Sequence, residues 1–184
     1  MKEAYYMHFV EGDQAARDRA GGLPTHLPPA FPRCADTGEE MAFLMQLYCE
    51  PGRLRLDDAM CLQLYQCANV GEGEDPLPVA VKVPPGAELN RGGAGVAHPL
   101  LNVLAVEWEM RSDPDEIPRE PAFAPEVLRL YDSKAGGAAA FREALPDGAR
   151  FLFQLNEEPA GFNFGGFTAV VYEDSGGGLG VALQ

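Results

Sequence analysis

The chain has no long hydrophobic run and few basic residues, serines or histidines. No stretch approaches the roughly 20 consecutive apolar residues that a membrane-spanning helix needs. The segment Met1–Val10 has one lysine and mixes aromatic with polar side chains. A signal peptide would instead have a basic start followed by a continuous apolar stretch. We therefore expect a cytoplasmic protein that does not bind membranes.

The charge is strongly negative, because 14 Lys and Arg residues stand against 28 Asp and Glu residues, a formal net charge of −14. Such a surface repels the phosphates of nucleic acids and anionic lipids, which argues against general nucleic-acid binding. It suits a basic protein partner. The alternative is that the acidic residues serve only solubility.

Common catalytic patterns are missing from the sequence. The serines and histidines are Ser112, Ser133, Ser175, His8, His26 and His98. No serine lies in a Gly-x-Ser-x-Gly pattern, and the histidines do not form His-Glu-x-x-His. The glycine run 92–95 lacks the Lys-Ser/Thr that follows a phosphate-binding loop. We therefore expect no enzymatic activity and no cofactor.

Proline and glycine are abundant, at 16 and 21 residues, which leaves little room for long helices. Alternating or β-branched runs predict strands. These runs are Ala4–Val10, Met41–Leu47, Met60–Cys67, Val79–Val83, Val103–Met110, Arg150–Leu155, Phe167–Glu173 and Leu179–Leu183. Short helices are predicted at Ala15–Ala20, Pro125–Tyr131 and Ala138–Leu145, and irregular segments at Gly22–Pro32, Pro84–Pro99 and Ser112–Ala124.

An internal repeat is the most informative pattern. The pentapeptide Phe-Leu-Met-Gln-Leu at 43–47 recurs at 151–155 with only its third residue changed. A Gly-Gly pair precedes each pentapeptide, at 21–22 and at 136–137. A pair ending in tyrosine follows each one, Leu64-Tyr65 and Val171-Tyr172. We predict one domain over 1–184, with pseudo-repeats at about 1–83 and 103–184 joined by a loop. The predicted class is α+β and β-rich, with two mainly antiparallel β units and a few short helices.

Gln46 and Gln154 are the polar residues of two otherwise apolar strands. A buried amide without a partner costs about 1–3 kcal/mol, so each must find hydrogen bonds. The partner is either backbone at the interface of the two halves or a bound extended peptide. Both residues are candidates for partner binding.

The segment Gly161–Phe167 is the best candidate for a functional surface. Its paired glycines allow close approach of a partner backbone, and its aromatic residues could wall the contact. The candidate residues are Asn163, Phe164, Gly165 and Gly166. The alternative is a glycine-kinked strand with core phenylalanines.

These motifs together resemble the YwqG-like proteins and their programmed-cell-death-2 and ribosome-maturation relatives, the TYPP superfamily. The resemblance rests on Gly-Gly-Leu-Pro at 21–24, the two pentapeptides, Trp108 with Asp113-Pro114, and Asn-Phe-Gly-Gly-Phe at 163–167. It covers most of the chain and implies a duplicated, mostly β architecture. It also implies either escort of a basic ribosomal protein or, for the bacterial members, a place in toxin-immunity systems.

The cysteines depart from that family pattern. A Cys-x-x-Cys is expected at the first cysteine, but Thr37 stands in the second position, and no cysteine follows Cys67. Structural zinc requires four ligands, so no metal is expected and Cys34 and Cys67 are only weak candidates. Without an export signal, all four cysteines should be reduced and mostly buried.

The sequence thus favours a non-catalytic protein-binding module, chaperone-like or immunity-type, with a basic partner. An alternative is an enzyme or RNA-processing factor that acts at a cleft between the two halves.

Overall fold

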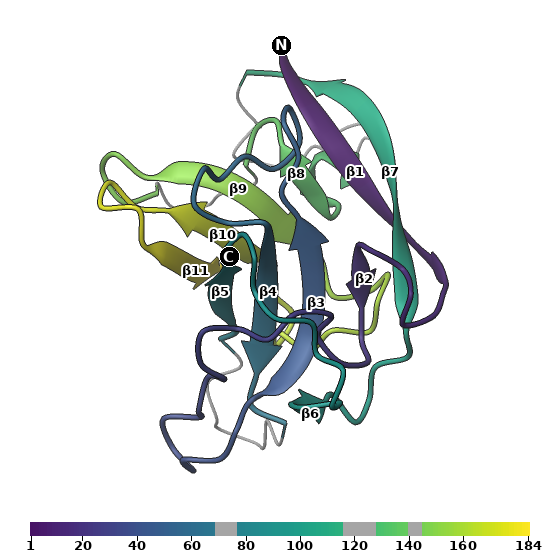
Figure 1. Ribbon diagram of the computed structural model, residues 1–184. Helices are drawn as coiled ribbons and strands as arrows, with labels where there is room; N and C mark the ends of the chain where they lie inside the picture. The colour runs from purple at the N-terminus through teal and green to yellow at the C-terminus, as the bar shows by residue number, and fades with distance from the viewer. Residues whose placement is uncertain (69–76, 116–127, 140–144) are drawn as a thin grey trace.

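The computed structural model describes residues 1–68, 77–115, 128–139 and 145–184. In these ranges eleven strands form one sheet, in the order β11-β10-β9-β8-β1-β7-β2-β3-β4-β5, with β6 paired to β3. The strands are β1 (Lys2–Glu11), β2 (Arg19–Ala20), β3 (Ala42–Tyr48), β4 (Cys61–Gln66), β5 (Val79–Val83), β6 (Val96–Ala97), β7 (Leu104–Asp113), β8 (Lys134–Gly136), β9 (Arg150–Leu155), β10 (Ala169–Glu173) and β11 (Leu179–Leu183). The sheet curls into a nearly closed ring, because the outermost strands β5 and β11 lie side by side (Figure 1).

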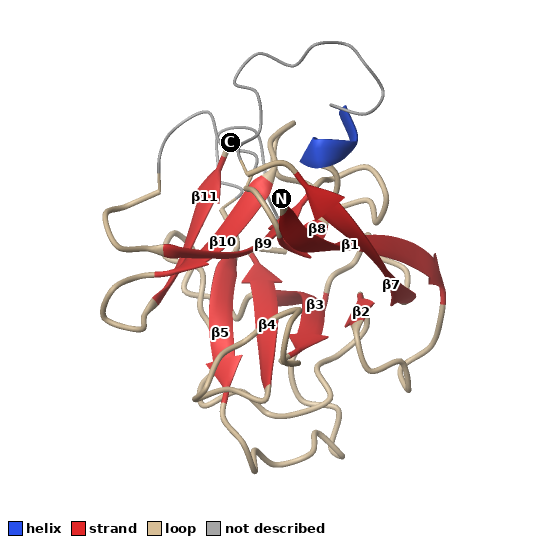
Figure 2. Cartoon of the chain, turned by 90° about the horizontal axis from the view of Figure 1, so that it is seen from above, coloured by secondary structure: helices blue, strands red, loops and turns tan. Residues whose placement is uncertain are grey.

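The β-rich, antiparallel character predicted from the sequence is confirmed, and each of the predicted strands overlaps a strand of the structure (Figure 2). The helical part of the prediction is wrong at Ala15–Ala20, where a turn leads into β2. The Asp13 carboxylate accepts the backbone N–H of Ala15 at 2.8 Å, a local bond that competes with helix formation. Of the second predicted helix, 125–127 lie outside the described residues, and the described part contains a 3₁₀ turn at Arg129–Tyr131; most of the third predicted helix also lies outside the described residues.

The two long strands β1 and β7 pair antiparallel along their whole length at the middle of the sheet, from Lys2↔Asp113 to Glu11↔Leu104. On its other edge β1 pairs with β8, and β7 pairs with β2. Strand β1, from the first half of the chain, therefore pairs with β8 from the second half, and β7, from the second half, pairs with β2 from the first half. This exchange joins the two halves of the chain in one sheet.

The same order of strands extends outward on both sides of the β1–β7 pair. One side has β2, β3, β4 and β5, and the other has β8, β9, β10 and β11. The two pentapeptides lie in β3 and β9, which are corresponding strands. The register corresponds as well, because Arg19 pairs with Gln46 while Lys134 pairs with Gln154.

Strands β3 and β4 are buried along their full length. Successive side chains of a strand point to opposite faces, so both faces must be covered. Leu44 belongs to the main core inside the ring, whereas Phe43 packs against Tyr65 and Phe31 in a second cluster. The irregular segment that carries Phe31 thus covers the outer face of the sheet. No helix in the described part of the chain has the length and apolar character needed to cross a bilayer.

Candidate functional site

Gln46 is fully buried and its amide is satisfied within the protein. Its Nε2 donates to the carbonyl of Arg17 at 2.7 Å and to the hydroxyl of Thr25 at 2.9 Å, and its Oε1 accepts the N–H of Thr25 at 3.0 Å. Gln46 therefore bonds to the backbone of the protein itself, which is the first of the two alternatives given for it above; the other was a bound extended peptide. Gln46 holds the turn after β2 in place and does not reach the surface.

Gln154 has the equivalent role in the other half. It is fully buried, and its Nε2 donates to the carbonyls of Leu130 at 3.1 Å and Asp132 at 2.9 Å. Arg17 and Asp132 each precede the first residue of the short strand β2 or β8 by two positions. The two glutamines thus bind the backbone at corresponding positions, two residues before β2 and two residues before β8.

The loop 157–167 contains the other candidate residues, and one carboxylate organises it. Glu157 Oε1 accepts the backbone N–H groups of Phe164 and, at 3.0 Å, of Gly166. Phe164 is fully buried and stacks on Phe162, with ring centroids 5.5 Å apart. Gly165 and Gly166 have φ values of 71° and 85°, the left-handed region that favours glycine.

Asn163, Gly165, Gly166 and Phe167 are among the exposed residues of this loop. Phe167 is 48% exposed, although it is a large aromatic side chain. The carbonyl of Asn163 accepts the amide of Gln66 at 2.7 Å, so the end of β4 supports the loop. The loop therefore combines a fixed backbone with an exposed aromatic residue.

The six predicted binding residues do not form one site through their hydrogen bonds. Gln46 bonds to the segment before β3, Gln154 bonds to the segment before β8, and the loop of Asn163 is bonded to Gln66. Phe164 contributes to the core and not to the surface. Of the predicted binding residues, Asn163, Gly165 and Gly166 are exposed, so the loop 157–167 is the part of the predicted surface that a partner can reach.

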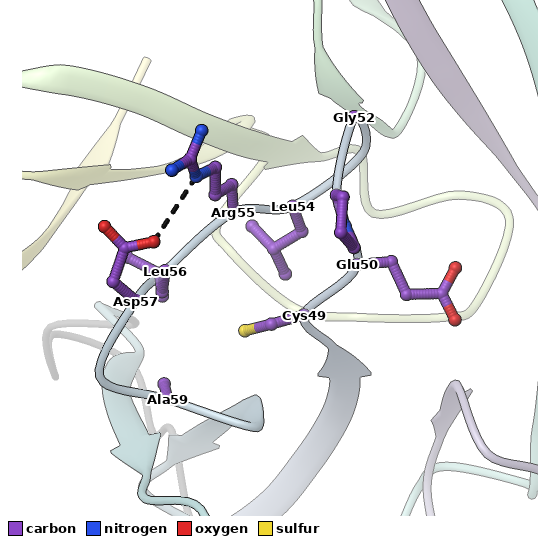
Figure 3. A pocket seen from close by; sticks show the side chains of 9 residues that line it. Cys49, Glu50, Gly52, Leu54, Arg55, Leu56, Asp57 and Ala59 are labelled. Carbon is purple, nitrogen blue, oxygen red and sulfur yellow. Dashed lines mark hydrogen bonds and ion pairs between the residues drawn. The ribbon is translucent and has the colours of Figure 1, made fainter.

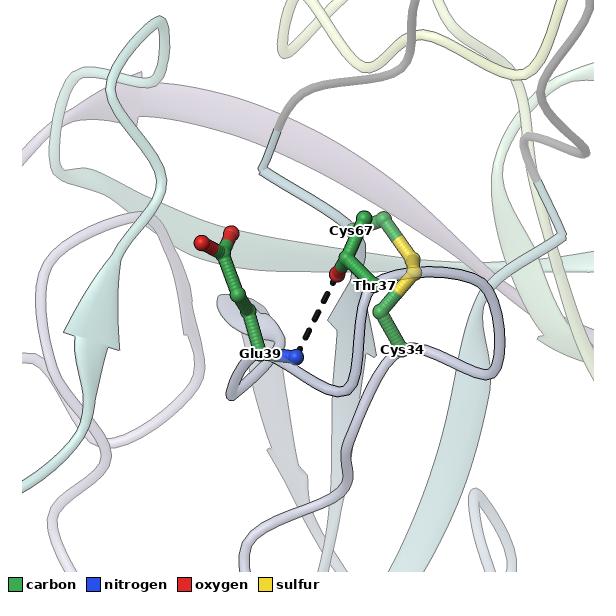
Figure 4. The surroundings of a disulfide bond; sticks show 4 residues. All are labelled: Cys34, Thr37, Glu39 and Cys67. Carbon is green, nitrogen blue, oxygen red and sulfur yellow. Dashed lines mark hydrogen bonds between the residues drawn. A yellow bond between two sulfur atoms is a disulfide. The ribbon is translucent and has the colours of Figure 1, made fainter.

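Cys34 and Cys67, the weak metal candidates, are joined by a disulfide with Cα atoms 5.6 Å apart (Figure 4). The expectation that all four cysteines are reduced is therefore wrong for this pair. The bond connects the irregular segment after Phe31 to the residue that follows β4. Within the described ranges, no group of three or more His, Cys, Asp or Glu side chains could hold a metal ion.

The remaining thiols, Cys49 and Cys61, are poor nucleophiles. Burial raises the pKa of Cys49 to about 11 and that of Cys61 to about 12. Cys49 lines a cavity of about 410 Å³ formed by the turn after β3, with Leu54, Leu56 and Ala59 around it (Figure 3). A thiol that keeps its proton near neutral pH does not supply the thiolate that nucleophilic chemistry requires.

A larger cavity, of about 620 Å³, lies where β1 meets β8, beside the junction of the two halves. His8, Arg111 and Arg129 line it. The Glu109 carboxylate accepts hydrogen bonds from His8 Nε2 at 2.9 Å and from Arg111 Nη2 at 2.6 Å. The hydrogen bond from Arg111, and then that from His8, lowers the pKa of Glu109 to about 2.

The burial of four charged residues in the described chain, Asp18, Arg19, Asp113 and Lys134, was not predicted from the sequence. Asp18 accepts Arg53 Nη2 at 2.7 Å and Trp108 Nε1 at 2.9 Å, and Arg53 lies over the Trp108 ring. Asp113 pairs with Lys134 at 2.5 Å. A signal existed in the sequence, because each of the two repeated Gly-Gly pairs follows a cation and an alanine, Arg-Ala-Gly-Gly at 19–22 and Lys-Ala-Gly-Gly at 134–137.

Comparisons of the chain with protein-family models and with curated proteins found no match. The site is therefore interpreted from its own geometry.

Proposed function

We propose that this protein is a non-catalytic protein-binding module whose partner is basic, and that the loop 157–167 is its main contact surface. The observation that carries the proposal is the arrangement of this loop, in which Glu157 fixes the backbone while Phe167 remains exposed. Binding hot spots are enriched in large side chains held near the centre of an interface. A loop already fixed in its bound form loses less conformational entropy on binding.

The net charge of −14 supports a basic partner, since complementary charge accelerates association and disfavours acidic proteins. An escort or immunity-type role follows from the resemblance to YwqG-like proteins, which is itself part of the proposal. The corresponding hydrogen bonds of Gln46 and Gln154 support a duplication of one folding unit as the origin of the chain.

The proposal is tested by capture from a host lysate with tagged protein, followed by quantitative mass spectrometry. Phe167→Ser should lose a basic protein that the unchanged chain retains. Leu100→Ser should retain that protein, because Leu100 is 76% exposed and lies outside the loop, which makes it a matched control.

Binding of the captured protein should weaken steeply between low and physiological salt, because screening reduces the attraction between exposed opposite charges. A partner that both serine variants retain equally, or whose affinity ignores salt, would contradict the proposal.

The cavity beside His8 favours a second candidate function, an enzyme or RNA-processing factor acting between the two halves. Its lining combines His8, Arg111 and Arg129 with Asp132, and Arg129, which forms no ion pair with the described residues, could contact a phosphate group. A fluorescent single-stranded RNA should then bind with lower affinity to Arg129→Gln than to Arg91→Gln, which removes the same charge outside this cavity.

A further inference from the structure

Arg19 and Lys134 occupy corresponding places in the two halves and are both buried, with exposed fractions of 1% and 0%. Their charges are balanced differently. Lys134 forms an ion pair with Asp113 at 2.5 Å. Arg19 donates only to neutral oxygens, namely the carbonyls of Ala16 and Leu23 and the hydroxyl of Thr25, and no described carboxylate lies within ion-pair distance of it.

Gln14 stands where the second half has Asp113. Asp113 Oδ2 accepts the N–H of Ala138, the residue after the second Gly-Gly pair, at 3.2 Å. Gln14 Oε1 accepts the N–H of Leu23, the residue after the first Gly-Gly pair, at 3.3 Å. An exposed neutral amide thus makes the backbone contact that, in the second half, is made by the buried carboxylate paired with Lys134.

A cavity of about 420 Å³ opens beside this uncompensated arginine. Most of the cavity wall comes from the two segments 22–32 and 84–99, which were predicted to be irregular. Their backbones are joined by a hydrogen bond from the Asn90 N–H to the Thr25 carbonyl at 2.8 Å. The lining residues are Gln14, Arg19, Leu23, Pro24, Thr25, Leu89, Asn90, Arg91 and Gly93. Its volume is within the range typical of small-molecule sites.

Hydrogen-bond donors without acceptors gather at this cavity. Arg19 Nε is buried and has no partner. Thr25 Oγ1 accepts from Arg19 Nη1 at 2.7 Å and from Gln46 Nε2 at 2.9 Å, which uses both of its lone pairs. The hydroxyl proton of Thr25 is therefore left to donate, and no acceptor for it lies among the described residues. Arg91 adds a second cation that forms no ion pair with them.

We propose that this cavity binds a carboxylate group carried on an apolar body, either the C-terminus of a peptide or a small carboxylic acid. A buried charge without a counter-charge is costly, and a bound anion would supply what Asp113 supplies to Lys134. Burial also lowers the pKa of Arg19, which reflects the same lack of compensation. The site shares no residue with the loop 157–167 and does not depend on the function proposed for that loop.

A carboxylate fits better than a phosphate for two reasons. The planar guanidinium matches the two oxygens of a carboxylate, and Leu23, Pro24 and Leu89 provide apolar walls for the group that carries it. A phosphate would bring about two negative charges toward a protein whose net charge is −14, which long-range repulsion opposes.

The test uses isothermal titration calorimetry on the full chain with N-acetyl-leucine and with N-acetyl-leucinamide, which differ only in the carboxylate. We expect the acid to bind at least about tenfold more tightly than the amide, as charge-assisted hydrogen bonds are worth about 1.5–3 kcal/mol. Equal affinities, no binding, or binding of inorganic phosphate alone would overturn the proposal. A peptide ending in leucine distinguishes the sources, because tighter binding of the peptide points to a chain end.

Variants make the test independent of folding defects at Arg19. Gln14→Glu places a carboxylate on the lining of the cavity and should weaken N-acetyl-leucine binding at least about tenfold. Ala15→Glu adds the same charge at an exposed neighbour that does not line the cavity and should leave binding within about twofold. If both variants weaken binding equally, the effect is general repulsion and the proposal is wrong.

Discussion

At the scale of single residues, the ion pair between Lys134 and Asp113 is the most deeply buried one in the described chain, with exposed side-chain fractions of 0% and 1%. Tyr6 also donates its hydroxyl to Asp113, at 2.6 Å. Removing one member of such a pair leaves the other charge buried and uncompensated. We expect Asp113→Asn to lower the free energy of unfolding in urea by about 3–5 kcal/mol.

A matched control for that substitution is Asp57→Asn, since the ion pair of Asp57 with Arg55 is exposed. It should change the free energy of unfolding by less than about 1 kcal/mol. Equal urea midpoints for the two variants would show that the buried pair does not stabilise the fold.

The thiol of Cys49 gives a second prediction at this scale, because burial raises its pKa from 9.0 to about 11. At pH 9 its alkylation by iodoacetamide should be at least about tenfold slower in the folded protein than in urea, as followed by mass spectrometry. The folded thiol keeps its proton at pH values where the unfolded thiol loses it. Its contribution to stability is therefore constant below about pH 9 and decreases as the pH rises from about 9 to about 11. Equal alkylation rates would contradict the assigned burial.

At the scale of elements, the turn after β2 depends on glycine. Gly21 has φ of 72°, and a Cβ at this position would collide with the carbonyl oxygen of Asn102, just before β7. Gly38 has a similar φ of 71° but open space around it. We expect Gly21→Ala to cost about 2–4 kcal/mol and Gly38→Ala about 1 kcal/mol, measured by urea unfolding. Similar costs would mean that backbone conformation alone, without the close approach to β7, makes glycine necessary.

At the scale of the whole molecule, the exchange of β1 and β7 between the halves predicts that they unfold together. β1 is hydrogen-bonded to β8, and β7 to β2, so neither half keeps its sheet if the other is lost. Urea unfolding followed by Trp108 fluorescence, which reports on the central pair, should coincide with unfolding followed by far-ultraviolet circular dichroism. Two separate transitions would show that the halves are independent.

The candidate surface was only partly predictable from local pattern. The segment Gly161–Phe167 could be selected because its glycines and aromatic residues are adjacent in the chain. The burial of Phe164 agrees with the alternative of core phenylalanines, but its contrast with the exposed Phe167 was not predictable, because it depends on Glu157 and on Gln66, a residue from another strand. The role of Gln46 as a support for Thr25 likewise required the position of a segment that is distant in the sequence.

The sequence by itself determined eight of the eleven described strands and the antiparallel β-rich class, because period-two patterns and glycine turns are local properties of the chain. The short strands β2, β6 and β8 were not predicted, because their pairing depends on neighbours that are distant in the sequence. Only the tertiary structure decided the exchange of β1 and β7, the pairing of Cys34 with Cys67, and the contrast between a compensated Lys134 and an uncompensated Arg19. These features depend on which side chains meet across the sheet. Register and long-range charge pairing set those meetings, and neither is encoded in any short stretch of residues.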